Sequence, residues 1–123
     1  MTNILVDTQV LIWIQTDSDR ITSKAHNLLI NPLVVKWISE VSLLEIAIKQ
    51  KIGKLPEFNL TLTEFVEQAE KDKFHILPIL RRYIIAYEQI PLINDHRDPF
   101  DRLILAMAKA ENWPVLSSDP KFS

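Results

Sequence analysis

Apolar residues along this chain alternate between short, mostly apolar runs and longer stretches with helical spacing. The runs are three to six residues long and resemble strands buried on both faces of a sheet. They lie at residues 3–6, 33–38, 74–77 and 114–116. Between them apolar residues recur every three or four positions, which predicts helices that each bury one face. The predicted helices cover residues 8–14, 22–30, 39–51, 61–73, 80–90 and 99–112.

This alternation predicts an α/β fold with a mostly parallel sheet covered by helices on both faces. In such sheets the functional site lies beyond the carboxyl ends of the strands. Asp7 directly follows the first apolar run, and Asp119 follows the fourth. We therefore expect both carboxylates at the same edge of the sheet.

Length and composition indicate one globular domain over residues 1–123, with 47% hydrophobic and 24% charged residues. The sequence has no cysteine, so carboxylates and imidazoles are the available metal ligands. Asp7 interrupts the apolar N-terminal stretch, so we expect neither a signal peptide nor a membrane span, and we expect a cytoplasmic protein.

The net charge of −2 does not suggest a nucleic-acid binder. Local basic clusters weaken that objection, because a patch rather than the total charge sets the local field. These clusters contain Lys49, Lys51 and Lys54, and Arg81, Arg82, Arg97 and Arg102.

Two further carboxylates lie at the predicted start of the last helix. Asp98 occupies the N-cap position, Pro99 the first helical position, and Asp101 comes three residues after the cap. Capping alone would explain both acids, because negative charge is favourable at a helix N-terminus.

Glu45 also has a structural explanation. With Ser42 it matches a capping box, and with Lys49 it forms a favourably oriented helix pair. However, Glu45 and Asp7 are embedded in apolar sequence, where an unpaired carboxylate is costly. Acids that meet at one edge would repel each other unless a cation joined them.

A divalent cation resolves this conflict. A carboxylate cluster without cysteine suits Mg²⁺ or Mn²⁺, which prefer oxygen ligands. Such an ion lowers the pKa of a bound water and polarises a phosphate, so a phosphodiester is the natural substrate.

Four separated blocks of this chain, in this order, resemble the PIN-domain ribonucleases, and most of all the VapC toxins of type II toxin–antitoxin modules. The blocks are Leu5-Val6-Asp7-Thr8 with Leu11-Ile12-Trp13; Ser42-Leu43-Leu44-Glu45-Ile46-Ala47-Ile48-Lys49 with Gly53-Lys54-Leu55; Asp98-Pro99-Phe100-Asp101-Arg102-Leu103; and Ser117-Ser118-Asp119-Pro120-Lys121-Phe122.

The resemblance implies a three-layer α/β/α domain that cleaves RNA internally with Mg²⁺ or Mn²⁺. By motif position the acidic quartet, with catalytic and metal-binding roles, is Asp7, Glu45, Asp101 and Asp119. Asp98 matches an additional aspartate, which we rank below Asp101 as a metal ligand because an N-cap has its own structural role. Thr8 and Ser117 match hydroxyl positions beside the first and last acids.

Two departures from the family pattern concern the pocket and the sheet. Glu40 stands at a position that is usually small, which would alter the charge of the pocket. Relatives often continue into a final strand past the position of Ser123.

The resemblance also implies partners: an RNA substrate, a second copy of the chain, and a cognate antitoxin whose segment lies in a groove beside the acidic pocket. A basic side chain of that segment would pair with Asp7, Asp101 or Asp119 and displace the metal. The crowding of apolar residues at Trp13, Ile14, Ile84, Ile85 and Tyr87 likewise predicts exposed apolar surface at interfaces.

Other functions fit the sequence less well. A haloacid-dehalogenase-like phosphatase needs an acid two residues after its first aspartate, where this chain has Gln9. A receiver-type phosphoacceptor domain needs an aspartate after a central strand, but the predicted second strand is followed by Ser39-Glu40. A degenerate PIN-like module that only binds proteins is the remaining alternative.

Histidines and tryptophans add little to this functional picture. His26, His75 and His96 lack ligand spacing, and only His96 is placed to contact RNA. Trp13, Trp37 and Trp113 are expected in the core or at an interface.

Overall fold

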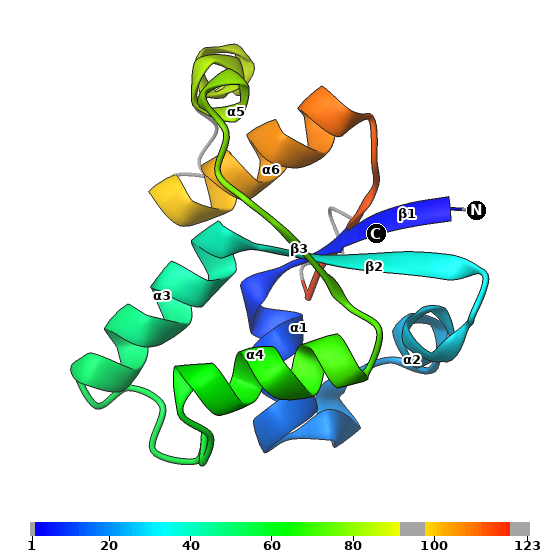
Figure 1. Cartoon of the computed structure of the whole chain (residues 1–123), viewed down its shortest axis with the longest axis vertical. Coiled ribbons are helices and arrows are strands. Elements are labelled where there is room, and N and C mark those ends of the chain that lie inside the picture. The colour runs from blue at the N-terminus through cyan, green and yellow to red at the C-terminus, as the bar shows by residue number, and fades with distance from the viewer. Residues whose placement is uncertain (1, 92–97, 119–123) are drawn as a thin grey trace.

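The computed structural model describes residues 2–91 and 98–118. Within these ranges the strands are β1 (Thr2–Val6), β2 (Val34–Ser39), β3 (His75–Leu77) and β4 (Val115–Leu116). They form one parallel sheet in the order β3-β2-β1-β4 (Figure 1). The predicted parallel α/β fold is confirmed.

Strand register brings the ends of β1, β2 and β4 together. Val6 is level with Ile38 on β2 and with Leu116 on β4. Asp7 and Ser117 each follow directly after these positions, so both leave the sheet at its carboxyl edge. The predicted placement of Asp7 at this edge is therefore confirmed.

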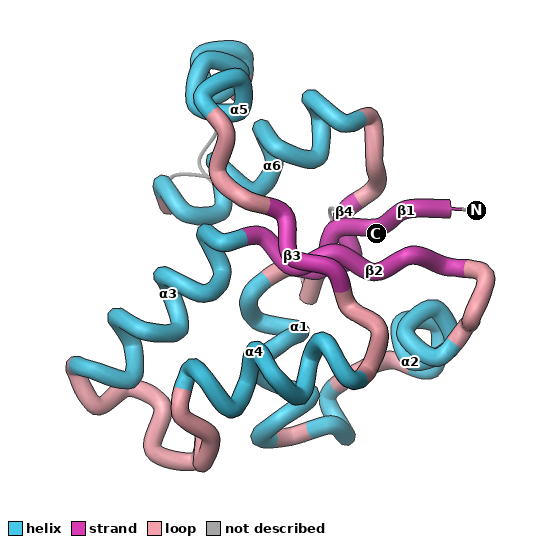
Figure 2. The backbone as a smooth tube through the Cα atoms, in the orientation of Figure 1, coloured by secondary structure: helices cyan, strands magenta, loops and turns pink. Residues whose placement is uncertain are grey.

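The helices interleave with the strands along the chain (Figure 2). They are α1 (Thr8–Thr16), α2 (Ser23–Ile30), α3 (Glu40–Lys51), α4 (Leu62–Lys71), α5 (Arg81–Ala86) and α6 (Pro99–Glu111), with the 3₁₀ turns η1 (Ser18–Arg20) and η2 (Tyr87–Gln89).

Two apolar cores separate the layers. One packs Ile4 and Val6 of β1 against α1, α2 and α4, and the other packs Leu5 of β1 against α5 and α6. Neighbouring residues of β1 thus face opposite cores, as the period of two in a strand requires. Figure 1 shows the sheet between these two sets of helices, which is the expected three-layer α/β/α arrangement.

Side-chain caps begin most of these helices. Asp7, Thr22 and Asp98 each accept a hydrogen bond from a backbone N–H one turn into the helix. Thr61 and Glu64 form a full capping box at α4. Local sequence therefore determines where these helices start.

The capping box proposed for Ser42 and Glu45 is wrong. Helix α3 begins at Glu40, and its cap is Ser39, whose Oγ accepts from the backbone N–H of Val41 at 2.9 Å. Ser42 is buried inside the helix and its hydroxyl lies 2.9 Å from that of Thr8. Since β2 runs directly into α3 at Ser39, Ser42 connects α3 to α1 instead of capping it.

Several element boundaries differ from the sequence prediction by one or more residues. The predicted helix 80–90 is a short α-helix that tightens into η2 after Ala86. Helix α4 ends before Lys73, whose φ of 70° is left-handed. Leu33 lies outside β2 and is exposed.

Trp37 and Trp113 pack together with ring centroids 4.9 Å apart, and the Trp37 ring also contacts His75. The indole N–H of Trp37 donates to Asn3 at 2.9 Å. Both rings pack against the second core, as expected. Among the residues placed by the structure, no helix is long and apolar enough to cross a membrane.

Candidate active site

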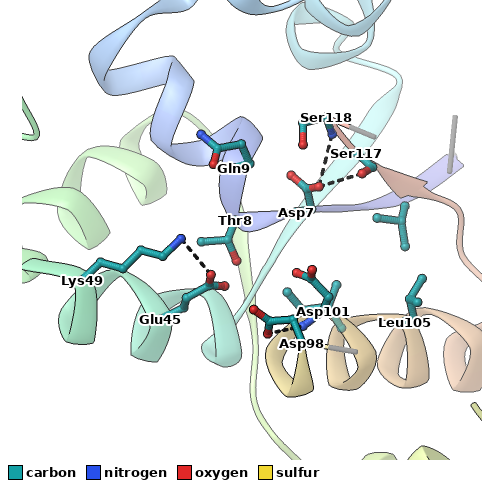
Figure 3. Close-up of a pocket in the computed structure, with 12 residues that line it drawn as sticks. Asp7, Thr8, Gln9, Glu45, Lys49, Asp98, Asp101, Leu105, Ser117 and Ser118 are labelled. Carbon is teal, nitrogen blue, oxygen red and sulfur yellow. Dashed lines mark hydrogen bonds and ion pairs between the residues drawn. The ribbon is translucent and has the colours of Figure 1, made fainter. Parts of the chain in front are cut away.

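A cavity of about 290 Å³ opens at the carboxyl edge of the sheet and is lined by four carboxylates (Figure 3). These are Asp7, Glu45, Asp98 and Asp101. They come from the β1–α1 junction, from α3 and from the start of α6, so residues 94 positions apart meet in one place. We call this space the acidic cavity.

Asp7 is held on both of its carboxylate oxygens. Its Oδ1 accepts from the N–H of Val10 at 2.9 Å, which caps α1. Its Oδ2 accepts from the Ser117 hydroxyl at 2.7 Å and from the Ser118 N–H at 3.2 Å. Burial nevertheless raises the pKa of Asp7, and the negative charge of Glu45 adds to that effect.

Glu45 is buried on α3 with only 6% of its surface exposed. Its Oε2 lies 3.1 Å from the ammonium of Lys49, so the predicted helix pair is confirmed. Its Oε1 is buried without a hydrogen-bond partner among the residues that the structure describes. A buried carboxylate oxygen with no partner is costly, which makes it the strongest sign in this cavity of a site built for a further ligand.

The α6 wall carries Asp98 and Asp101. Asp98 caps the helix as expected, and its Oδ1 accepts from the N–H of Phe100 at 2.8 Å and of Asp101 at 3.3 Å. Burial raises the pKa of Asp101 to about 6, and the charges of Asp98, Glu45 and Asp7 contribute in that order. The carboxylates therefore interact electrostatically, which is the repulsion that a shared cation would relieve.

A family model matches the chain that builds this site: the PIN domain model covers residues 4–123. The chain belongs to the PIN domain family.

A solved structure shares this PIN fold. It is a chain of "Crystal structure of VapBC2 from Rickettsia felis bound to a DNA fragment from their promoter", with a TM-score of 0.66 and 16% sequence identity. The match covers 98% of this PIN domain and 91% of that chain. Among curated proteins, no sequence matches this one significantly.

The structure of this PIN domain brings together four of the five predicted acidic residues, and Thr8 and Ser117 also line the acidic cavity. The fifth acid, Asp119, lies outside the described residues, as do His96 and Arg97. His26 and His75 line a different cavity, near the start of β2.

We expected Glu40 to alter the charge of the cavity, but its carboxylate lies elsewhere. Its side chain is absent from the cavity lining, and its Oε1 instead accepts a hydrogen bond from the backbone N–H of Ile79 at 3.0 Å. This bond joins the start of α3 to the segment that leads into α5.

Arg102 has a role that the sequence reasoning missed. We counted it in a basic surface cluster, but it is only 7% exposed. Its guanidinium donates to the hydroxyl of Tyr87 and to the carbonyls of Ile90 and Pro91, at 2.7 to 3.2 Å. Its position inside an apolar helix, next to Asp101, was the signal available in the sequence. Arg102 thus ties the end of η2 to the first turn of α6.

The donor set of the PIN cavity fits a hard divalent cation. Its polar atoms are mostly carboxylate and hydroxyl oxygens, and the bare Oε1 of Glu45 needs a positive partner. Over residues 2–91 and 98–118, no three acidic or histidine side chains are gathered tightly enough to hold one ion jointly. The fit therefore rests on donor chemistry and on the repulsion among the acids.

Proposed function

We propose that this PIN domain is a Mg²⁺- or Mn²⁺-dependent endoribonuclease and the toxin of a type II toxin–antitoxin module. PIN domains are generally nucleases that use divalent metal ions. The observation that carries the proposal is the acidic cavity, where Glu45 is buried and one of its oxygens has no partner among the described residues. A polyanionic substrate would not enter such a cavity unless a cation offset the carboxylates.

The proposed role of each residue follows from its surroundings in the cavity. Asp7, Glu45 and Asp101 would hold the cation, and Asp119 joins them by its motif position. Asp98 contributes charge while its Oδ1 caps α6. When bound, the ion would activate water and polarise the scissile phosphodiester. Ser117 and Ser118 keep the Asp7 carboxylate oriented through their two bonds to Oδ2.

An apolar cavity of about 530 Å³ adjoins the acidic one and supports the antitoxin part of the proposal. It is lined by apolar side chains of β1, α2 and β4. Val115, Ser117 and Ser118 line both cavities. An antitoxin segment anchored there by apolar side chains would reach the carboxylates with an Arg or Lys and compete with the metal. The fold shared with VapBC2 agrees with such a partner.

Two rows of exposed apolar side chains support the homodimer. The rows are Leu44 and Ile48 on α3 with Ile52 at its C-cap, and Leu80, Ile84 and Ile85 at α5. The backbone N–H of Ile79, next to Leu80, donates to Glu40 at the start of α3. The expected exposure of Ile84 and Ile85 is confirmed, and such a surface is typical of an interface. Sedimentation should give a dimer that Ile84→Asp dissociates, whereas a monomeric parent protein would contradict the proposal.

Cleavage of a single-stranded RNA by the purified chain tests the activity directly. We expect internal cuts with Mg²⁺ or Mn²⁺, none in excess EDTA, and none from Asp7→Asn. Asp17→Asn is the matched control, because Asp17 lies at the other end of α1 and is exposed. Full activity in EDTA would overturn metal dependence, and turnover of phosphomonoesters instead of RNA would favour a phosphatase.

A further inference from the structure

Lys49 is the one cationic side chain among the described residues that line the acidic cavity. It lies on α3 one turn after Glu45, and its ammonium is 3.1 Å from Glu45 Oε2. A third of its side chain is exposed, against 8% for its partner. Figure 3 shows the long Lys49 side chain reaching back along α3 to Glu45. The ammonium is therefore held at the border between the cavity and solvent.

The negative charge of the acidic cavity suggests a function for the Lys49 ammonium at its mouth. Four carboxylates line it, and one divalent ion would offset two of their charges. The substrate backbone carries one negative charge per nucleotide, so its approach requires a further cation near the cavity mouth. Lys49 has that charge, and an ammonium has three donors, of which the Glu45 pair occupies one.

We propose that Lys49 binds a phosphate of the RNA backbone at the mouth of the acidic cavity, and that Glu45 holds its ammonium in place for that contact. The inference rests on the proposed ribonuclease function and adds a substrate-binding residue to it. Glu45 then has two roles on its two oxygens: Oε2 orients Lys49, and Oε1 would be available to a bound cation.

A plain surface ion pair is the competing explanation for Lys49. Such a pair stabilises a helix slightly and has no effect on RNA affinity. Lys51 provides the matched control, because it is an exposed lysine on the same helix that does not line the cavity. Any general loss of positive charge from α3 would affect both lysines equally.

The test measures binding of a non-cleavable, 2′-O-methylated single-stranded RNA to the full chain across a salt series at one low Mg²⁺ concentration. We expect Lys49→Gln to weaken binding about ten-fold, the scale of one charge-assisted contact. The slope of log affinity against log salt should fall by about 0.7, as for one lost phosphate contact on a single strand. Lys49→Arg should restore most of the affinity, and Lys51→Gln should behave like the parent protein.

Binding of Mn²⁺ to the same variants, without RNA, separates substrate contact from structural damage. Lys49→Gln should bind Mn²⁺ as tightly as the parent protein or more tightly, because a positive charge beside Glu45 has been removed. A parallel loss of Mn²⁺ and RNA binding would show a structural role and overturn the proposal. Equal salt slopes for Lys49→Gln and Lys51→Gln would overturn it as well.

The outcome for the parent protein keeps the two proposals apart. If it cleaves RNA while Lys49→Gln binds RNA with unchanged affinity, the Lys49 assignment fails and the ribonuclease proposal stands. If it does not cleave RNA under any metal condition, the ribonuclease proposal itself fails.

Discussion

Asp7 and Asp98 begin two helices that border the same cavity, and both cap the backbone in the same way. Each accepts from an N–H in the first turn of its helix, at 2.9 Å in α1 and at 2.8 Å in α6. Their surroundings differ. Asp7 follows the central strand and receives two further hydrogen bonds from the end of β4, whereas the bonds that Asp98 accepts come from its own helix.

This difference shows why a capping motif alone does not identify a functional acid. A cap satisfies backbone donors with one oxygen and needs no distant partner. Asp7 also holds its second oxygen in a buried position that raises its pKa. Burial of its charge, which costs free energy, and hydrogen bonds from a remote segment distinguish Asp7 from Asp98, and carboxylates with such a raised pKa cluster at functional sites.

The largest expected effect comes from Asp7→Asn. We expect RNA cleavage to fall by about 100-fold or more, the scale of losing one group that acts on the transition state. Thermal stability should stay the same or rise at neutral pH, because asparagine caps a helix as well and burial disfavours the charged form of Asp7. Cleavage rates and thermal unfolding of the variant measure both effects. Unchanged cleavage would remove Asp7 from the site.

Arg102→Met should instead lower the stability of the protein, because Arg102 anchors the first turn of α6. It would leave the Tyr87 hydroxyl and the Ile90 and Pro91 carbonyls without their donor, at a cost of about 3 kcal/mol in the free energy of unfolding. Urea unfolding measures this cost. Arg81→Met is the control, because Arg81 is an exposed arginine of α5. Equal losses in both variants would contradict the anchoring role.

Asp101 should make stability depend on pH in the absence of metal. Its pKa rises from 3.8 to about 6 on folding, so the folded protein binds the extra proton between these values. Asp101 therefore favours the folded state below about pH 4, and this contribution is lost as the pH rises through about 6. Melting temperatures in EDTA should fall over that interval, and Asp101→Asn should flatten the change. Mn²⁺ affinity should fall below pH 6, because protons compete with the ion for the Asp101 carboxylate. If the melting temperature of Asp101→Asn depended on pH as that of the parent protein does, the assignment of this pH dependence to Asp101 would be wrong.

The smallest expected effects are at Asp98. Asp98→Asn should preserve stability, and Asp98→Ala should lower the free energy of unfolding by about 1 kcal/mol, because alanine cannot cap α6. The loss of Mn²⁺ affinity should be smaller for Asp98→Asn than for Asp101→Asn. Calorimetric titration of both variants compares them directly, and the reverse order would make Asp98 the better ligand.

Much of the fold was predictable because its causes are local. The buried runs of β1 and β2 read as strands from three or more consecutive apolar residues, and the caps Asp7, Thr22, Thr61 and Asp98 marked helix starts to within a residue. Since parallel strands end at one edge of a sheet, the alternation of elements also placed Asp7 correctly. Convergence of Glu45 and Asp101 with Asp7 followed from the family resemblance and not from any local pattern.

The errors concern residues whose roles depend on distant partners. Ser42 matched a capping box. However, α3 begins directly after β2, so Ser39 caps the helix and Ser42 contacts Thr8 instead. Glu40 was expected to change the cavity charge, yet it accepts a bond from Ile79, 39 residues away. Hydrogen bonds of this kind are decided by packing, which no local window contains.

By itself, the sequence determined the order of strands and helices, most helix starts and the acids available for chemistry. These depend on backbone caps and on apolar periodicity within a few residues. Only the tertiary structure decided that Oε1 of Glu45 is buried without a partner in residues 2–91 and 98–118, that Arg102 is an internal anchor, and that Lys49 borders the acidic cavity. Burial and partner choice arise when segments far apart in the chain pack together, so the free-energy cost of each charge is set there.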